Sequence, residues 1–207
     1  NGTVYTNAIP ITNTTILRAA AFKPGHLPTD VDTHTYVFPD QVIRQPAWPE
    51  GFPTAWKGDG ANANADYEMD PEIVDHQLYS NKMVAALCAL PVMSLITDTN
   101  HLFDPETGFY VNPLKQGVAW ERPTSVEFFL PDGKSCFQID CGLRIYGGSS
   151  RSTDFPKKTL RLLFKGEYGA TKLRYPLFGD DPFGGDAVEE FDTIILRGGH
   201  NNTGIHR

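Results

Sequence analysis

Residues 142–164 constrain the fold more than any other part of this 207-residue chain; they read GLRIYGGSSRSTDFPKKTLRLLF. An apolar run leads into a turn of small residues, and the chain returns as a run in which apolar and polar residues alternate. Alternation with a period of two is typical of a β-strand with one buried face. We therefore predict two strands joined by a glycine-rich loop.

The alternation divides the returning strand into two faces. One face carries Lys158, Leu160, Leu162 and Phe164. The other face carries Lys157, Thr159, Arg161, Leu163 and Lys165. Because burying an unpaired ammonium group is costly, a lysine on the apolar face needs a partner in a pocket. Lys158 is therefore a candidate binding residue.

The loop between the two strands has the composition of an anion site. It consists of Gly147, Gly148, Ser149, Ser150 and Arg151. Glycines can adopt positive φ, and consecutive backbone N–H groups in such a turn form a concave nest for anions. The hydroxyls and the guanidinium add donors, and a lysine on the next strand can bind phosphate. The same spacing also fits a plain hairpin turn with solvated lysines, since short glycine loops are common in β proteins.

The loop and its neighbours resemble the CotH kinase family, which is related to atypical kinases and was first known from a bacterial spore-coat protein. Members carry an Arg-Gly-x-Ser-Ser/Thr-Arg loop, then Pro-Lys-Lys and an alternating strand that ends in Phe. Further motifs match in order at residues 90–95, 108–112, 120–123, 126–129, 167–169, 175–178 and 191–197. One position departs from the family: Tyr146 stands where many members have Arg. A nucleotide contact made by that Arg would be missing here.

The resemblance implies the nucleotide-facing N-terminal half of an atypical protein kinase. It assigns nucleotide binding to Gly147, Gly148, Ser149, Ser150, Arg151 and Lys158. It also implies ATP with Mg²⁺ or Mn²⁺ as cofactors of the complete domain, a protein substrate, and a bacterial protein that is secreted or in the cell envelope. In the family the metal-binding and catalytic acids follow the Leu-Arg-x-Gly loop, here residues 196–199. We therefore expect them beyond Arg207 and expect this chain to be incomplete for catalysis.

The N-terminal part predicts a separate small β module. Short strands are expected at residues 4–5, 9–11, 14–22 and 32–38. Residues 1–38 resemble part of the sandwich-like module at the C-terminus of chitobiases and hexosaminidases, an accessory that does not itself imply glycosidase activity. Residues 39–65 are a connecting segment rich in Pro, Gly and Trp, and its tryptophans are expected to pack against the next domain. Residues 66–207 form the truncated kinase-like domain.

Periodicity over the remaining chain favours a mostly β domain. Residues 77–90 have apolar residues at near-helical spacing, and Pro91 ends the expected helix. Strands are expected at residues 92–97, 109–112, 125–130, 137–146 and 191–197, with a turn at residues 98–101. The predicted fold class is α+β, with mostly antiparallel β-structure and one main helix, preceded by a partial β-sandwich-like module.

Composition limits the kinds of partner that the chain can bind. The formal net charge is −7 and no basic stripe stands out, which argues against nucleic acid. No apolar run has membrane-spanning length. The spacing of Cys88, Cys136 and Cys141 shows no metal-ligand pattern, so we predict no metal site and expect the three thiols to be buried as small hydrophobes. Exposed strand edges favour self-association.

Two other functions stay open. The chain fits a non-catalytic extracellular or envelope module, structural or carbohydrate-associated, in which the loop is scaffold. It also fits an ester or glycoside hydrolase whose site cannot be read from the sequence. There is no Gly-x-Ser-x-Gly elbow, although Ser149 and Ser150 follow glycines, and a histidine could approach them in space.

Overall fold

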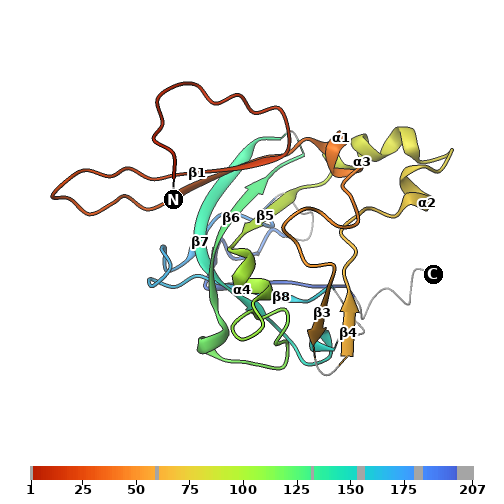
Figure 1. Cartoon of the computed structure of the whole chain (residues 1–207). Helices are drawn as coiled ribbons and strands as arrows, with labels where there is room; N and C mark the ends of the chain where they lie inside the picture. Colours follow the sequence, from red (N-terminus) through yellow and green to blue (C-terminus); the bar gives the residue numbers. More distant parts are fainter. Residues whose placement is uncertain (1, 59–60, 132, 153–156, 180–183, 200–207) are drawn as a thin grey trace.

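A five-stranded antiparallel sheet forms the centre of the molecule (Figure 1). The computed structural model describes residues 2–58, 61–131, 133–152, 157–179 and 184–199. In spatial order the strands are β11 (Thr193–Leu196), β8 (Leu160–Leu163), β7 (Ser135–Ile145), β6 (Arg122–Phe129) and β5 (Val92–Ile96). Every neighbouring pair is antiparallel. The predicted class, α+β with mostly antiparallel strands, is confirmed.

The sheet has one apolar face and one polar face. Because partners across an antiparallel pair share a face, Leu143 and Leu162 lie together on the apolar face. The buried core on that face comprises Phe109, Val126, Cys141, Leu143, Ile145, Leu162, Phe164 and Leu173. Each fully buried aliphatic or aromatic side chain stabilises the fold by about 1.5–3 kcal/mol. The polar face carries Ser94, Glu127, Gln138, Asp140, Arg144 and Arg161.

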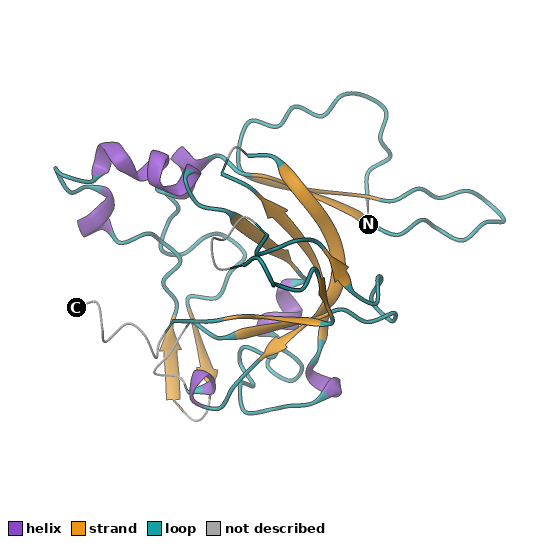
Figure 2. Ribbon diagram, turned by 180° about the vertical axis from the view of Figure 1, so that it is seen from behind, coloured by secondary structure: helices purple, strands orange, loops and turns teal. Residues whose placement is uncertain are grey.

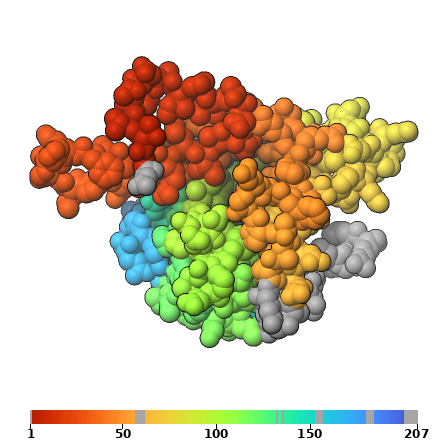
Figure 3. Space-filling model, in the orientation of Figure 1, coloured from red at the N-terminus to blue at the C-terminus, as the bar shows by residue number. Residues whose placement is uncertain are grey.

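An N-terminal hairpin covers part of the polar face. It consists of β1 (Thr15–Ala19) and β2 (Asp32–Tyr36). The backbone N–H of Thr35 donates to the carboxylate of Glu127 at 2.5 Å, and its hydroxyl lies 2.9 Å from the Ser94 hydroxyl. The expected strands at residues 4–5 and 9–11 are wrong: within the described ranges these residues are coil that pairs with no strand, and all but Ile11 are exposed. In the space-filling view the N-terminal residues spread over one side of the molecule, and the β1–β2 connection projects from it (Figure 3).

The connecting segment has structure of its own. It contains α1 (Pro39–Val42) and a hairpin of β3 (Ala55–Gly58) with β4 (Ala61–Asn64). The ring of Trp56 lies 5.5 Å from Phe103 and 5.7 Å from Tyr110, centroid to centroid. The prediction that this segment packs against the domain through a tryptophan is confirmed for Trp56. Trp48 stays mostly exposed, and its indole N–H donates to the Ala65 carbonyl.

The sequence pattern predicts one main helix, whereas the structure has several short ones. They are α2 (Pro71–Val74), the 3-10 turn η1 (Ser80–Lys82), α3 (Met83–Cys88), α4 (Thr99–Phe103) and the 3-10 turn η2 (Val118–Trp120). The expected helix over residues 77–90 is reduced to α3, because Leu78 and Leu90 are 61% and 60% exposed and no packing extends it. Figure 2 shows α1, α2 and α3 together at one corner of the molecule. Within the described ranges, no helix has the length and apolar character needed to cross a bilayer.

Two local predictions are corrected near α4. The expected turn at residues 98–101 is the start of this helix, which Asp98 caps by accepting from the Asn100 N–H at 2.8 Å. The expected strand at residues 109–112 is a turn, because Phe109 and Tyr110 donate their N–H groups back to residues of α4. The last short pair consists of β9 (Leu173–Arg174) and β10 (Glu190–Phe191).

The three cysteines differ in environment. All are free thiols: Cys88 is exposed, Cys136 half-buried and Cys141 buried. The expectation that all three are buried is wrong for Cys88, which lies at the end of the short α3. Burial raises the pKa of the Cys141 thiol to about 12. Because this pKa lies above the ordinary value of 9.0, the neutral thiol is favoured by folding.

Alkylation should therefore separate the cysteines. At pH 8 we expect iodoacetamide to modify Cys88 and to leave Cys141 unmodified until the protein is unfolded, as read by mass spectrometry of peptides. The contribution of Cys141 to stability is present below pH 9.0 and is lost as the pH rises toward about 12. Modification of Cys141 in the folded protein at a rate equal to that of Cys88 would contradict its burial.

Replacing Glu127 should loosen the N-terminal hairpin. Glu127→Ala removes the acceptor of the Thr35 N–H, so we expect faster hydrogen exchange at that amide and a loss of about 1–3 kcal/mol of stability. Exchange followed by mass spectrometry and a urea titration measure the two effects. Glu106→Ala, at an exposed position, is the control and should change neither. Unchanged exchange across β2 in Glu127→Ala would refute this contact.

Candidate functional site

The glycine-rich loop continues directly from β7. The last rung of the β7–β8 ladder is the Tyr146 N–H bond to the Thr159 carbonyl at 2.8 Å, and the 3-10 turn η3 (Ser149–Arg151) follows. Gly147 has φ of 88°, a conformation that favours glycine, whereas Gly148 has φ of −96°. Successive residues with φ of opposite sign turn their N–H groups toward one concavity, which is the geometry of an anion nest.

The loop presents backbone donors at its surface. In the described part of the chain, the N–H groups of Gly147 and Gly148 donate to no other group. Both glycines and Ser149 are exposed, and a Cβ at Gly148 would meet nothing within 4 Å. An incoming acceptor could therefore reach these amides without displacing a side chain.

Arg151 holds the loop in place. It is only 7% exposed, and its guanidinium donates to four backbone carbonyls. Nε reaches the Gly147 carbonyl at 2.6 Å, Nη2 reaches Ile145 at 2.7 Å, and Nη1 reaches Pro113 at 2.5 Å and Lys115 at 3.0 Å. Burial, aided by nearby Arg144, lowers the pKa of Arg151 below its ordinary value. This arginine thus ties the loop to the segment before β6.

Lys158 and Ser150 also face inward. Lys158 is 4% exposed, and its Nζ donates to the Ser152 carbonyl at 2.6 Å. The Ser150 hydroxyl donates its proton in a hydrogen bond to the Tyr146 carbonyl. In a hydrolase this proton would instead point to a histidine that removes it as a base. Lys158 is buried beside the loop, as expected, but it lines neither of the two cavities next to the loop. Pro156 of the Pro-Lys-Lys motif lies outside the described residues.

Two cavities flank the loop. The first has a volume of about 350 Å³, and Tyr146, Ile195 and Arg197 line it together with loop residues. The second has a volume of about 490 Å³, with Trp120 and Tyr146 among its walls. The charged residues that line the second cavity are all cationic: Lys115, Arg144, Arg151 and Arg161. Tyr146 and Gly147 line both cavities, so the predicted loop lies where they meet.

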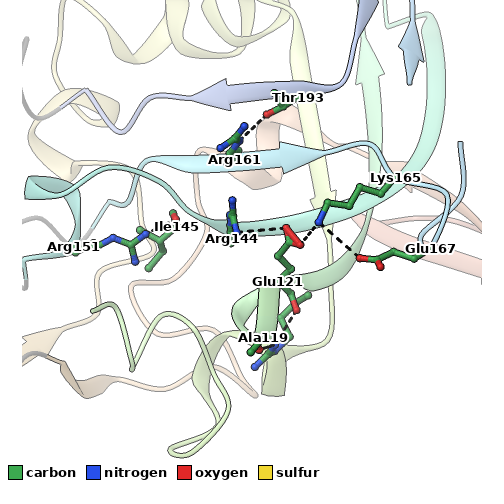
Figure 4. A network of polar contacts seen from close by, with 10 residues as sticks. Ala119, Glu121, Arg144, Ile145, Arg151, Arg161, Lys165, Glu167 and Thr193 are labelled. Atoms are coloured by element: carbon green, nitrogen blue, oxygen red, sulfur yellow. Dashed lines mark hydrogen bonds and ion pairs between the residues drawn. The ribbon is translucent and has the colours of Figure 1, made fainter. Parts of the chain in front are cut away.

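A charged network on the polar face adjoins the second cavity (Figure 4). Glu121 is buried with its carboxylate between Arg144, at 3.7 Å, and Lys165. Arg161 donates from Nε to the Thr193 hydroxyl at 2.9 Å, and its guanidinium lies over the Tyr146 ring at 5.6 Å from the centroid. Sequence reasoning did not select Arg144 or Glu121 and placed Arg161 only on the polar face. The signal in the sequence that could have identified the two arginines is that each lies within an apolar run, Arg144 before the loop and Arg161 after it.

The described ranges contain no group of three or more His, Cys, Asp or Glu side chains that could hold a metal ion. The binding of ATP with Mg²⁺ or Mn²⁺ therefore stays a prediction that follows from the resemblance. Of the six predicted site residues, Gly147, Gly148 and Ser149 face solvent. The remaining three hold the loop: Ser150, Arg151 and Lys158.

Arg151→Lys should destabilise the protein although it keeps the charge. A lysine cannot reproduce the guanidinium fork, so most of the four carbonyl contacts are lost, and we expect unfolding free energy to fall by about 2–4 kcal/mol. Chemical denaturation measures the change. Arg174→Lys, at an exposed ion pair, is the matched control with little expected effect. Equal stability of the two variants would show that Arg151 does not hold the loop.

Comparison of the chain with protein-family models, with curated proteins and with solved structures finds no match. What the loop binds must therefore be inferred from its geometry and from the charges around it.

Proposed function

We propose that the loop at residues 147–151 and the first cavity bind a nucleotide, as the nucleotide-facing part of a CotH-like atypical protein kinase. The observation that carries this proposal is the pair of unpaired amides at the exposed Gly147 and Gly148, of which Gly147 lines a cavity with an aromatic and an aliphatic wall. A nucleotide combines a flat base with an anionic phosphate chain, so it needs both kinds of surface.

The first cavity supplies the surface for the base. Tyr146, which directly follows β7, and Ile195 of β11 are both partly exposed and line the cavity. At this position many family members have Arg, so the tyrosine ring replaces a charge with a surface on which a base can stack. Arg197 adds a cation at the same cavity, where it can pair with a phosphate or hydrogen-bond a ribose hydroxyl.

The loop supplies phosphate positioning, which is one of three requirements for phosphoryl transfer. The other two are a metal held by acids and a group that orients the attacking hydroxyl. Under this proposal ATP and Mg²⁺ or Mn²⁺ are the cofactors, a protein is the substrate, and the cell location is the bacterial envelope or exterior. Self-association through the edge strands β5 and β11 stays a further prediction.

A non-catalytic structural module is the second candidate. Arg151 and Lys158 both donate to backbone carbonyls of the loop, and side chains used in this way stabilise a scaffold. Under this alternative the chain would have no measurable affinity for nucleotides.

Calorimetric titration with ATP and Mg²⁺ tests the proposal. We expect the unchanged protein to bind and Ile195→Trp, which fills the first cavity, to bind at least about tenfold more weakly, a difference of about 1.4 kcal/mol. Val188→Trp is the matched control, because Val188 is exposed and lines neither cavity. Absence of binding to the unchanged protein, or equal binding by Ile195→Trp and the control, would reject a nucleotide site here.

A further inference from the structure

Arg144 and Arg161 form a like-charged pair across two strands. They are register partners in the antiparallel β7–β8 ladder, so their side chains lie directly opposite each other on the polar face. Like charges in this arrangement repel and destabilise a sheet. Such a pair therefore needs a compensating negative charge.

The protein supplies only part of that charge. Glu121 lies 3.7 Å from Arg144, but the same carboxylate also accepts from Lys165. In the described ranges Arg161 has no carboxylate partner; its contacts are the Thr193 hydroxyl and the Tyr146 ring. Cations thus outnumber carboxylates at this site, in a chain whose overall charge is −7.

The two guanidinium groups also have unused donors. Within the described residues Arg144 donates no side-chain hydrogen bond, and Arg161 donates only from Nε. Both line the second cavity, whose volume of about 490 Å³ exceeds what a bare tetrahedral anion needs. Planar guanidinium groups bind phosphate and related oxyanions through two parallel hydrogen bonds. Lys115 lines the same cavity and can add a third cation.

Glu121 positions one arm of the pair. Its side chain is fully buried, and its carboxylate lies between Arg144 and Lys165 (Figure 4). The ion pair with this carboxylate holds Arg144 in place. Tyr146 limits the other arm, because Arg161 lies over its ring. Arg161 lines the second cavity and not the first, although Tyr146 and Gly147 line both.

We infer that Arg144 and Arg161 form a second binding site, for a tetrahedral oxyanion such as the phosphate or sulfate group of a larger ligand. The anion would lie between the two guanidinium groups and neutralise their repulsion. The remaining volume of the cavity, beside Trp120, would hold the part of the ligand that carries the anion. This site does not depend on nucleotide binding at the first cavity.

Thermal unfolding in orthophosphate and in sulfate, each matched in ionic strength with chloride, tests the inference. We expect the midpoint of the unchanged protein to rise with the logarithm of anion concentration. Both salts also stabilise folded proteins in general, so the part of the response that Arg161→Gln loses is what supports the site. Equal midpoints in both anions and in chloride would overturn it.

Arg161→Gln should have different effects on stability without the anion and on affinity for the anion. Without the anion, this variant should be no less stable than the unchanged protein, because a repulsion is removed. Its apparent anion affinity should be at least about tenfold weaker, since one of two charge-assisted contacts is lost. Arg161→Lys keeps the charge but loses the parallel N–H donors of the guanidinium group. Its apparent anion affinity should lie between those of the unchanged protein and Arg161→Gln. An unchanged anion response in Arg161→Gln would refute the role of the pair.

Two further variants complete the test. Arg174→Gln removes an exposed arginine on β9 and should keep the full anion response. Arg197→Gln, which removes the cation that lines only the first cavity, should also keep it. Loss of the response in Arg197→Gln would place the anion in the proposed nucleotide site and overturn the claim of a second one. Failure of ATP to bind, with an intact anion response, would reject the nucleotide proposal and leave this site standing.

Discussion

The register between β7 and β8 is the constraint on which the rest of the structure depends. Pairing Leu143 with Leu162 puts both in the core, and it therefore puts Arg144 opposite Arg161 on the other face. A slip of β8 by one residue would turn its side chains over, burying Arg161 and exposing Leu160 and Leu162. The burial of the leucines thus holds the arginines together in spite of their repulsion, and the same register brings the chain out of β7 at the glycine-rich loop.

The loop shows that cations can serve either to hold a structure or to bind a ligand. Arg151 and Lys158 are buried, and each donates to backbone carbonyls, which have partial negative charge and do not move. Arg144 and Arg161 lie nearby, yet both line a cavity. The same residue type thus has two roles, and burial together with the nature of the acceptor distinguishes them.

Local patterns predicted the strands well where their own side chains decide the outcome. The alternation in residues 157–165 identified the face that carries Leu162 and Phe164, and both are buried. The helix over residues 77–90 was overestimated, because a helix of that length needs tertiary packing that its apolar side chains do not receive. The strands expected at residues 4–5 and 9–11 failed for a similar reason, since no neighbouring strand completes their hydrogen bonds.

The arrangement of the site could not be predicted in the same way, because it depends on contacts between segments that are distant in sequence. The position of Arg151 follows from carbonyls at Pro113 and Lys115, which are far from it in sequence. The pairing of Arg144 with Arg161 required the register to be known, and Glu121 enters only because β6 begins beside β7. No periodicity within one segment contains this information.

The tether made by Arg151 has a consequence for the speed of binding. It joins the loop to the chain at residues 113–115, and Lys115 itself is part of a cavity wall. Loop and wall are therefore held as one body before any ligand arrives, so that a ligand orders little of the chain when it binds. A site of this kind loses little conformational entropy on association. Its association rate is then set by diffusion and by electrostatic attraction of the anion, without a slow closing step.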